Sequence, residues 1–311
     1  MRSPTTFSSS DRAGMKLSVL VLALCSSFAV LAEPVVHTAG QSEAGATATL
    51  NALKAHFEQT MPEVKGDAFV DGALNFNKGS REYNKFWEDR FKDDFDQPDE
   101  YKSAFANGKA IWEKPFPDGK RFSDCFKDDG KGAAATYPKV LADGKVATFE
   151  HALNQCLETH QAKPLAYGDM KTMGALSLYA RRLSDGARVN VAVNTDAEKA
   201  AFERGKKLYY TRAGQLGMAC ASCHTQQAGK TLRSEELSPV IGQAAHFPVF
   251  RPNRATAHLD VVTLQKRYEG CQTNVKVADP YKAGSAELND LEFFHTYVSN
   301  GLPMRSGAFR K

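Results

Sequence analysis

The chain has 311 residues, 42% of them hydrophobic, and its 40 basic and 36 acidic side chains leave a formal net charge of +4 at pH 7. A charge this near to balance, without a cluster of lysines and arginines, argues against a nucleic-acid-binding protein. Beyond the N-terminal leader no run of about 18 apolar residues occurs, so no membrane-spanning helix is expected.

Residues 1–32 have the pattern of a secretory signal peptide. Arg12 and Lys16 precede the apolar run LSVLVLAL, and small residues lead to a cleavage site after Ala32. The sequence therefore predicts export to the periplasm, with Cys25 removed in the leader. An oxidising compartment pairs thiols. The mature chain keeps the cysteines Cys125, Cys156, Cys220, Cys223 and Cys271.

The first half of the mature chain, residues 33–190, carries Cys125 in RFSDCFKDDG and Cys156 at the end of TFEHALNQC. No C-x-x-C-H motif surrounds Cys125, because Phe122 and Phe126 occupy the flanking positions. With only each other nearby, the two cysteines most simply form a disulfide, and two buried free thiols are the alternative. A disulfide that closes a loop of about 30 residues stabilises a protein by roughly 3 kcal/mol.

A helix is expected at the start of the second half, residues 191–311, where the connecting segment ARVNVAVNTD ends. Asn194 and Thr195 can cap this helix, because their side-chain oxygens can accept from the first free N–H groups. Along AEKAAFERGKKLYY one side of the helix gathers small and apolar residues, namely Ala201, Phe202, Gly205 and Leu208.

The most specific motif follows this helix and reads Cys220-Ala221-Ser222-Cys223-His224. Two thiols at C-x-x-C spacing can add to the two vinyl groups of one haem, and the adjacent histidine becomes the proximal ligand of the iron. A redox C-x-x-C that happens to precede a histidine is the alternative. The sequence predicts one covalently attached haem c, held by Cys220, Cys223 and His224.

A second helix is expected at the end of the chain, where Ser285 opens AELNDLEFFHTYVSNG. A helix before the haem motif and another at the end resemble the class I cytochrome c plan, so a mainly α fold is predicted. The second axial ligand of such proteins comes from the segment between. That segment contains no methionine, since Met218 and Met304 lie outside it, and its candidates are His246, His258 and Cys271.

An internal repeat favours Cys271 among these candidates. TFEHALNQC at 148–156 aligns with TLQKRYEGC at 263–271, and the same offset places ALSLYARRLSDG at 175–186 on DLEFFHTYVSNG at 290–301. We therefore expect two tandem cytochrome c-like domains, the first without haem. Cys271 is the counterpart of Cys156, whose partner occupies the position of the haem motif, and so Cys271 is expected near the iron.

Arg267 precedes Cys271 by four residues, which places both side chains on one face if this segment is helical. The guanidinium fork can bind a sulfonate or a similar oxyanion with two hydrogen bonds. An unpaired thiolate is a nucleophile that can carry sulfur as a persulfide or mixed disulfide. A solvated surface charge is the alternative for Arg267.

The haem motif, then FPVFRP at 247–252, TLQKRYEGC, and a helix beginning SAELNDLEFF together resemble the SoxA family, the larger subunits of SoxAX cytochromes. The resemblance implies an L-cysteine S-thiosulfotransferase that joins thiosulfate oxidatively to a cysteine of a SoxYZ carrier and releases electrons into haem c. It also implies His224 and Cys271 as axial ligands, Cys271 as the sulfur-carrying residue, Arg267 as the thiosulfate-binding residue, and a heterodimer with a small SoxX cytochrome.

Many SoxA proteins bind a second haem in the N-terminal domain, whereas this chain has no attachment motif there. It looks like the single-haem subtype, in which a disulfide takes the place of that haem. Two other functions remain open at this stage. One is an electron-carrier cytochrome without sulfur chemistry, and the other is a thiosulfate dehydrogenase, a family that generally carries two haem motifs.

Overall fold

The computed structural model describes residues 38–72, 99–232, 235–252, 259–308 and 310. The predicted signal peptide lies outside these ranges, so the structure does not test it. Residues His37–Lys311 form one compact unit. Within the described ranges, none of the helices has the length and apolar character needed to cross a membrane.

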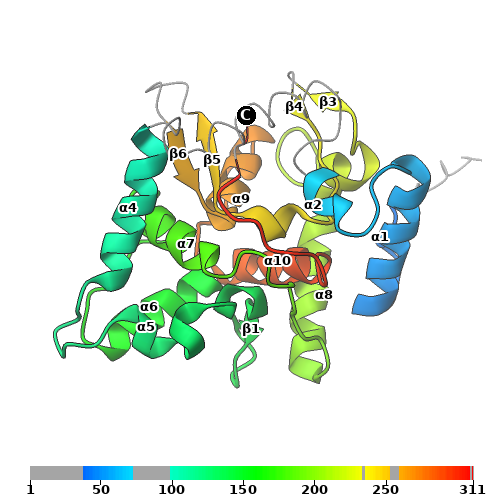
Figure 1. Ribbon diagram of the computed structural model, residues 1–311. Coiled ribbons are helices and arrows are strands. Elements are labelled where there is room, and N and C mark those ends of the chain that lie inside the picture. Colours follow the sequence, from blue (N-terminus) through cyan, green and yellow to red (C-terminus); the bar gives the residue numbers. More distant parts are fainter. Residues whose placement is uncertain (1–37, 73–98, 233–234, 253–258, 309, 311) are drawn as a thin grey trace, which may run out of the picture. The chain divides into compact units, whose positions relative to one another are not determined.

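The described first half is mainly helical (Figure 1). Two N-terminal helices, α1 (Ala46–Thr60) and α2 (Ala68–Gly72), come before α4 (Asp99–Glu113). Short turns follow as α5 (Phe122–Cys125), η1 (Lys127–Gly130) and η2 (Ala133–Thr136). An antiparallel hairpin of β1 (Lys139–Val140) and β2 (Val146–Ala147) then leads to α6 (Phe149–Thr159) and α7 (Met173–Arg182).

The second half continues with α8 (Asp196–Tyr210), the π-helical turn η3 (Ser222–Gln226), and a hairpin of β3 (Thr231–Leu232) and β4 (Glu235–Glu236). After η4 (Gln243–His246), a second antiparallel hairpin pairs β5 (Val249–Pro252) with β6 (Leu259–Val262). The chain then forms α9 (Leu264–Asn274) and α10 (Ala286–Tyr297). Both helices expected in this half are confirmed, and Thr195 rather than Asn194 caps α8.

Each half contains one closely packed pair of crossing helices, α4 with α7 and α8 with α10 (Figure 1). In both pairs a glycine lies at the crossing. A Cβ atom added to Gly108 of α4 would lie 2.1 Å from the carbonyl oxygen of Ala175 in α7. A Cβ atom added to Gly205 of α8 would lie 2.0 Å from the carbonyl oxygen of Asp290 in α10. Each helix pair therefore approaches closely only because one partner has no side chain there.

The segment between the crossing helices is also repeated. Gly132 and Gly242 have positive φ angles of 72° and 91°, and each begins a 3-10 turn, η2 or η4. A cis peptide bond to proline follows each turn, at Tyr137-Pro138 and at Phe247-Pro248. A hairpin and two helices then complete each set. The repeat that the sequence predicted over two short stretches thus extends to the order of the surrounding elements.

A buried ionic group links the helices of the two halves. Arg181 of α7 donates to Glu150 of α6 from Nε and Nη2, both at 3.1 Å, and its Nη2 lies 3.4 Å from Oε1 of Glu292 in α10. Ser177 donates to Glu150 at 2.5 Å, and Gln265 of α9 donates to Glu292 at 2.8 Å. Under the alignment of the repeat, Glu150 corresponds to Gln265 and Ser177 to Glu292, so the same two positions pair in both halves.

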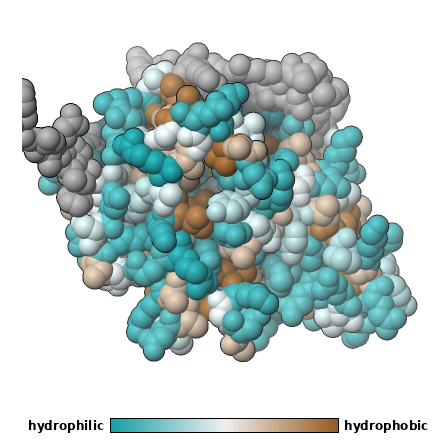
Figure 2. All heavy atoms as spheres, turned by 180° about the vertical axis from the view of Figure 1, so that it is seen from behind, coloured by the Kyte–Doolittle hydropathy of each residue, from teal (hydrophilic) through white to brown (hydrophobic). Residues whose placement is uncertain are grey.

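The face of the protein that is turned away from the viewer in Figure 1 is predominantly hydrophilic where its residues are described (Figure 2). Figure 2 shows hydrophilic residues over most of one face, with smaller apolar groups between them. Among the described residues, the exposed large hydrophobic side chains are Leu141, Leu216, Leu232 and Tyr281.

Candidate functional site

The Cys220–His224 motif directly follows the loop after α8. The backbone N–H of Ala219 donates to Oγ of Ser222 at 3.0 Å, which fixes the start of the turn. Cys220 and Cys223 are half-buried and neither is in a disulfide. Tyr209, at the end of α8, bonds through its hydroxyl group to Oγ1 of Thr225 at 2.8 Å and so ties this helix to the motif.

The ring of His224 is held through its Nδ1 atom. This atom lies 2.9 Å from the carbonyl oxygen of Ser238, and the side-chain amide of Gln243 contacts it at 2.7 Å. In the tautomer in which Nδ1 donates to the Ser238 carbonyl oxygen, the lone pair is on Nε2. Burial lowers the pKa of His224 to about 4, and the charges of Arg267 and Arg310 act in the same direction. The imidazole is therefore neutral at pH 7, as a metal ligand must be.

Helix α9 carries both residues of the predicted sulfur-binding motif. Oγ1 of Thr263 accepts from the N–H of Lys266 at 3.2 Å and caps the helix. Arg267 and Cys271 are four residues apart on this helix and are both half-buried. The helical arrangement expected for them is confirmed, and it places the guanidinium and the sulfur on one face.

The electrostatic contacts bring this face against the Cys220–His224 motif. Burial and, to a smaller extent, the neighbouring Cys271 together raise the pKa of Cys220 to about 12. The pKa of Cys223 is raised by burial and by Cys271, and the charge of Arg267 opposes that rise. Arg267 also acts on His224. Five residues that the sequence singled out therefore lie close enough to interact, although they come from segments about 45 residues apart.

Two further residues at this site escaped the sequence analysis. The hydroxyl group of Tyr268 bonds to Nδ1 of His295 at 2.8 Å, and both side chains are buried. Nε2 of His295 has no hydrogen-bond partner among the described residues. Burial lowers the pKa of His295 to about 3, and the neighbouring His224 adds to that effect. A tyrosine next to Arg267 and a histidine on the apolar face of the last helix look like ordinary core residues in the sequence.

The alternative axial ligands have different surroundings. His246 is buried, and neither of its ring nitrogens has a hydrogen-bond partner within the described part of the chain. Burial lowers its pKa well below the usual value, and its charged neighbours are Arg310, His295 and Arg305. His258 lies outside the described residues. Cys271 thus acts electrostatically on Cys220 and Cys223, whereas the charged neighbours that act on His246 are Arg310, His295 and Arg305.

The donor set fits haem c. Two unpaired thiols at C-x-x-C spacing, a neutral histidine with its Nδ1 anchored, and a third free thiol facing them are what covalent attachment and axial ligation require. In the first half, Cys125 and Cys156 instead form a disulfide with an Sγ–Sγ distance of 1.96 Å and a Cα–Cα distance of 6.0 Å. The predicted disulfide is therefore confirmed.

Comparison with known proteins gives consistent matches. The family described as SoxA/TsdA, cytochrome c domain, matches residues 107–189 and 204–304. The L-cysteine S-thiosulfotransferase subunit SoxA of Chlorobaculum tepidum is 35% identical over 265 residues, which cover 85% of this chain and 87% of the relative. The same subunit of Allochromatium vinosum is 34% identical over 84% of this chain and 88% of the relative. The crystal structure of SoxXA from P. pantotrophus superposes with a TM-score of 0.63 at 28% identity, covering 73% of this chain and 84% of that one.

Proposed function

This chain belongs to the SoxA family of cytochromes, and we propose on that premise that it is the catalytic subunit of an L-cysteine S-thiosulfotransferase. Its substrates would be thiosulfate and a cysteine of a SoxYZ-like carrier protein. One observation carries the proposal, which is that Arg267 and Cys271 of α9 lie near enough to Cys220, Cys223 and His224 to shift the pKa values of these three groups. An electron carrier needs the haem motif but has no use for an arginine beside an unpaired thiol.

The overall reaction joins the carrier thiol to the outer sulfur of thiosulfate. The reaction forms one S–S bond between the carrier and thiosulfate, and the product on the carrier is R–S–S–SO3⁻. One proton and two electrons are released. In the first step the Cys271 thiolate bonds to the outer sulfur of thiosulfate, with loss of two electrons. In the second step the carrier thiol attacks that sulfur, loses its proton and releases the Cys271 thiolate.

Arg267 has the geometry for the anionic end of thiosulfate. It lies one helical turn from Cys271 on the same face of α9, so a sulfonate bound by the guanidinium points its outer sulfur along the helix toward Cys271. Cys220 and Cys223 would hold haem c covalently, and His224 and Cys271 would bind its iron. The two electrons would enter this haem one at a time, the first passing to the haem of the partner cytochrome before the second is taken up.

We assign one haem to this chain and none to its first half. The repeated order of helices, turns and hairpins supports two tandem cytochrome c-like domains, residues 33–190 and 191–311. In the first of them Trp112 stacks on Phe122 and on Phe126, with ring centroids 5.4 Å and 5.8 Å apart. These rings and the Cys125–Cys156 disulfide occupy the surroundings that correspond to the haem motif, which supports the single-haem assignment.

The partner of the proposed enzyme would be a small SoxX-like cytochrome, which would complete the active site and receive electrons. The match to a SoxXA structure supports this heterodimer. The predicted signal peptide supports a periplasmic location, where the carrier and thiosulfate would be met.

The test is thiosulfate conjugation with the purified haem-loaded chain, its partner cytochrome and the carrier, followed by the mass of the carrier. Cys271→Ala should lower turnover by 1000-fold or more, on the order seen when a covalent nucleophile is removed. Arg267→Gln should raise KM for thiosulfate by roughly 10-fold or more and leave haem content unchanged, because a charged hydrogen bond is lost. The exposed Arg212→Gln is the matched control. Wild-type turnover of Cys271→Ala would identify an electron carrier instead.

A further inference from the structure

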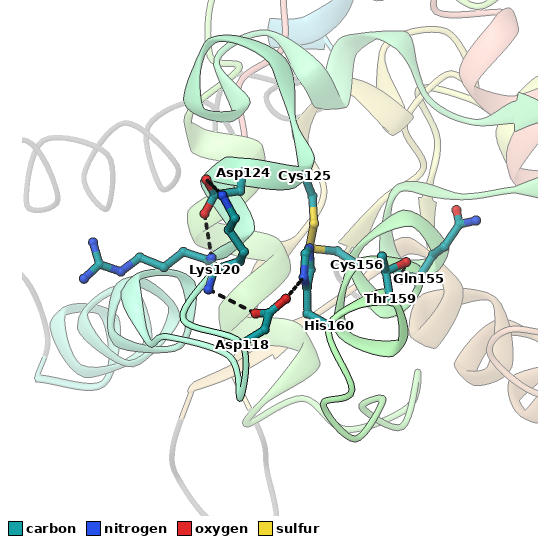
Figure 3. Close-up of a disulfide and its surroundings, with 9 residues drawn as sticks. Asp118, Lys120, Asp124, Cys125, Gln155, Cys156, Thr159 and His160 are labelled. Carbon is teal, nitrogen blue, oxygen red and sulfur yellow. Dashed lines mark hydrogen bonds and ion pairs between the residues drawn. A yellow bond between two sulfur atoms is a disulfide. The ribbon is translucent and has the colours of Figure 1, made fainter.

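A second group of sulfur and imidazole side chains lies in the first half of the chain. The sulfur atoms of Cys125 and Cys156 and one ring nitrogen of His160 all lie within 4.8 Å of one another (Figure 3). Cross-linking by a disulfide makes no use of a histidine, and neither does the proposed sulfur chemistry at Cys271. The presence of this imidazole beside the disulfide therefore needs its own explanation.

The backbone of α6 sets the distance between Cys156 and His160. His160 ends the helix and its N–H bonds to the carbonyl oxygen of Cys156 at 3.2 Å. The two side chains are four residues apart, a spacing that allows two side chains of one helix to bind the same ion. Cys125 comes from the last residue of α5, so the third donor is brought in by a different element.

The ring of His160 is oriented by a turn from outside the helix. Nδ1 lies 2.6 Å from Oδ2 of Asp118 (Figure 3). The ring also stacks on Phe116, with centroids 5.1 Å apart and planes 10° apart. Asp118 is itself held, because its Oδ1 accepts from the N–H of Lys120 at 3.0 Å. With Nδ1 engaged by a carboxylate, Nε2 is the nitrogen left for a ligand. Metal-binding histidines commonly have this carboxylate partner.

We propose that Cys125, Cys156 and His160 form a binding site for a borderline or soft divalent cation such as Zn²⁺ when the disulfide is reduced. Asp118 is the positioning residue, and formation of the disulfide closes the site. A dithiol reductant supplies two electrons and two protons, breaks the S–S bond and leaves two thiols. Binding of the cation then displaces the two thiol protons, and the fourth position of a tetrahedral Zn²⁺ remains open to water.

The distances allow this arrangement. Zn²⁺ bonds to thiolate sulfur at about 2.3 Å and to imidazole nitrogen at about 2.0 Å, so neighbouring ligand atoms lie roughly 3.3 to 3.8 Å apart. The two sulfur atoms and one ring nitrogen of His160 already lie within 4.8 Å of one another, so the main change needed is that the sulfur atoms separate once the S–S bond is broken. The side chains of the two cysteines and of His160 can make that change by small rotations, with the backbone in place.

The test uses the haem-loaded full chain with Cys271→Ala, so that Cys125 and Cys156 provide the free thiols. After anaerobic reduction and removal of the reductant, Zn²⁺ is titrated against a chromophoric chelator. We expect one equivalent to bind to the reduced chain with release of two protons, and none at this site in the oxidised chain. The difference between reduced and oxidised forms of the chain with Cys271 intact should show the same equivalent.

Single substitutions then test the histidine and its carboxylate. His160→Gln and Asp118→Asn leave the disulfide intact, and each should weaken Zn²⁺ binding by about 10-fold to 100-fold in the reduced form. His151→Gln, on the same helix, should leave the affinity unchanged. Equal Zn²⁺ binding by reduced and oxidised chains would overturn the proposal. So would equal affinities for the His160, Asp118 and His151 variants, since cysteines in an unfolded chain bind metal without regard to these residues. No thiosulfate is used, so the result does not depend on the proposed function.

Discussion

The two halves of this protein have the same order of structural elements, and they differ in whether the cysteine of the capped helix is in a disulfide. Each half crosses two helices at a glycine, turns through a 3-10 segment and a cis-proline, and continues into a hairpin and a threonine-capped helix. At the end of that capped helix, Cys156 is bonded to Cys125, whereas Cys271 is unpaired and faces the Cys220–His224 motif. The difference teaches that equivalent positions of the two halves can hold either a disulfide-bonded cysteine or a free thiol.

The two halves also differ in which of two equivalent buried positions carries the carboxylate. In the first half Glu150 is the acid and Ser177 its partner, whereas in the second half Glu292 is the acid and Gln265 its partner. One guanidinium, that of Arg181, serves both carboxylates. Burial and the nearby Glu150 raise the pKa of Glu292 to about 7. Burial is the largest single influence on Glu150 and acts to raise its pKa, but the charge of Arg181 and the hydrogen bonds from Arg181 and Ser177 together lower it on balance.

Removal of Arg181 should break the ion pairs that link Glu150 of the first half to Glu292 of the second half. Of the changes considered, it should lower the free energy of unfolding the most. Arg181→Met leaves two buried carboxylates without a counter-charge, which costs roughly 3 to 5 kcal/mol in the free energy of unfolding at pH 7. Urea denaturation measures it. The neighbouring Arg182→Met, which loses a partly exposed ion pair with Asp185, should cost less than about 1 kcal/mol. Adding Glu150→Gln and Glu292→Gln to Arg181→Met should restore much of the loss, and no recovery would contradict the ionic explanation.

The glycine crossings test whether the two scaffolds are equivalent. Gly108→Ala and Gly205→Ala each push a methyl group into a backbone carbonyl and should each cost about 2 to 4 kcal/mol in the free energy of unfolding. Asn107→Ala and Glu203→Ala, exposed neighbours on the same helices, should change it by less than about 0.5 kcal/mol. A large cost at one glycine and none at the other would show that the crossings differ.

The raised pKa of Glu292 predicts a pH dependence of stability. The folded protein keeps a proton on Glu292 up to about pH 7, whereas an unfolded chain loses it near pH 4.5. Glu292 therefore contributes stability below pH 4.5 that is lost as the pH rises to about 7, by at most about 1.4 kcal/mol per pH unit. Glu150, with its lowered pKa, contributes stability that is lost only in more acidic solution.

Unfolding experiments across this pH range can isolate that contribution. Glu292→Gln should remove the fall between pH 4.5 and 7 on the order of 1 to 3 kcal/mol. The exposed Glu158→Gln should retain the wild-type profile. A profile of Glu292→Gln that parallels the wild type would mean that Glu292 does not hold this proton.

The threonines that cap α6 and α9 allow the same substitution in both halves, and its expected effect on the free energy of unfolding is the smallest. Thr148→Ala and Thr263→Ala each remove the oxygen that accepts from an N–H at the start of α6 or α9, and each should cost about 1 kcal/mol. Thr159→Ala and Thr273→Ala, at exposed positions near the other ends of these helices, should cost less. Because α9 carries Arg267, Thr263→Ala should also raise KM for thiosulfate, whereas Thr148→Ala should not.

Signals that extend over a few residues were enough to predict much of this molecule. The spacing of Cys220, Cys223 and His224, the capping residues of α8 and α10, and the interval from Arg267 to Cys271 are all local. The number of cysteines added the Cys125–Cys156 disulfide, because an oxidising compartment leaves few alternatives. These features depend on covalent spacing and helix periodicity, which a sequence displays directly.

Only the tertiary structure decided how the halves meet. Glu150, Arg181 and Glu292 read as surface charges, and their burial as one group depends on packing between helices more than 100 residues apart in sequence. The carboxylate of Asp118 reaches His160 across 42 residues, and Tyr268 reaches His295 across 27. Such contacts leave no periodic pattern, because each depends on where a whole helix comes to rest. The sequence by itself thus singled out the residues that we propose for the chemistry, because their spacing is local, and the packing of the helices decided which polar partners hold the buried side chains in position.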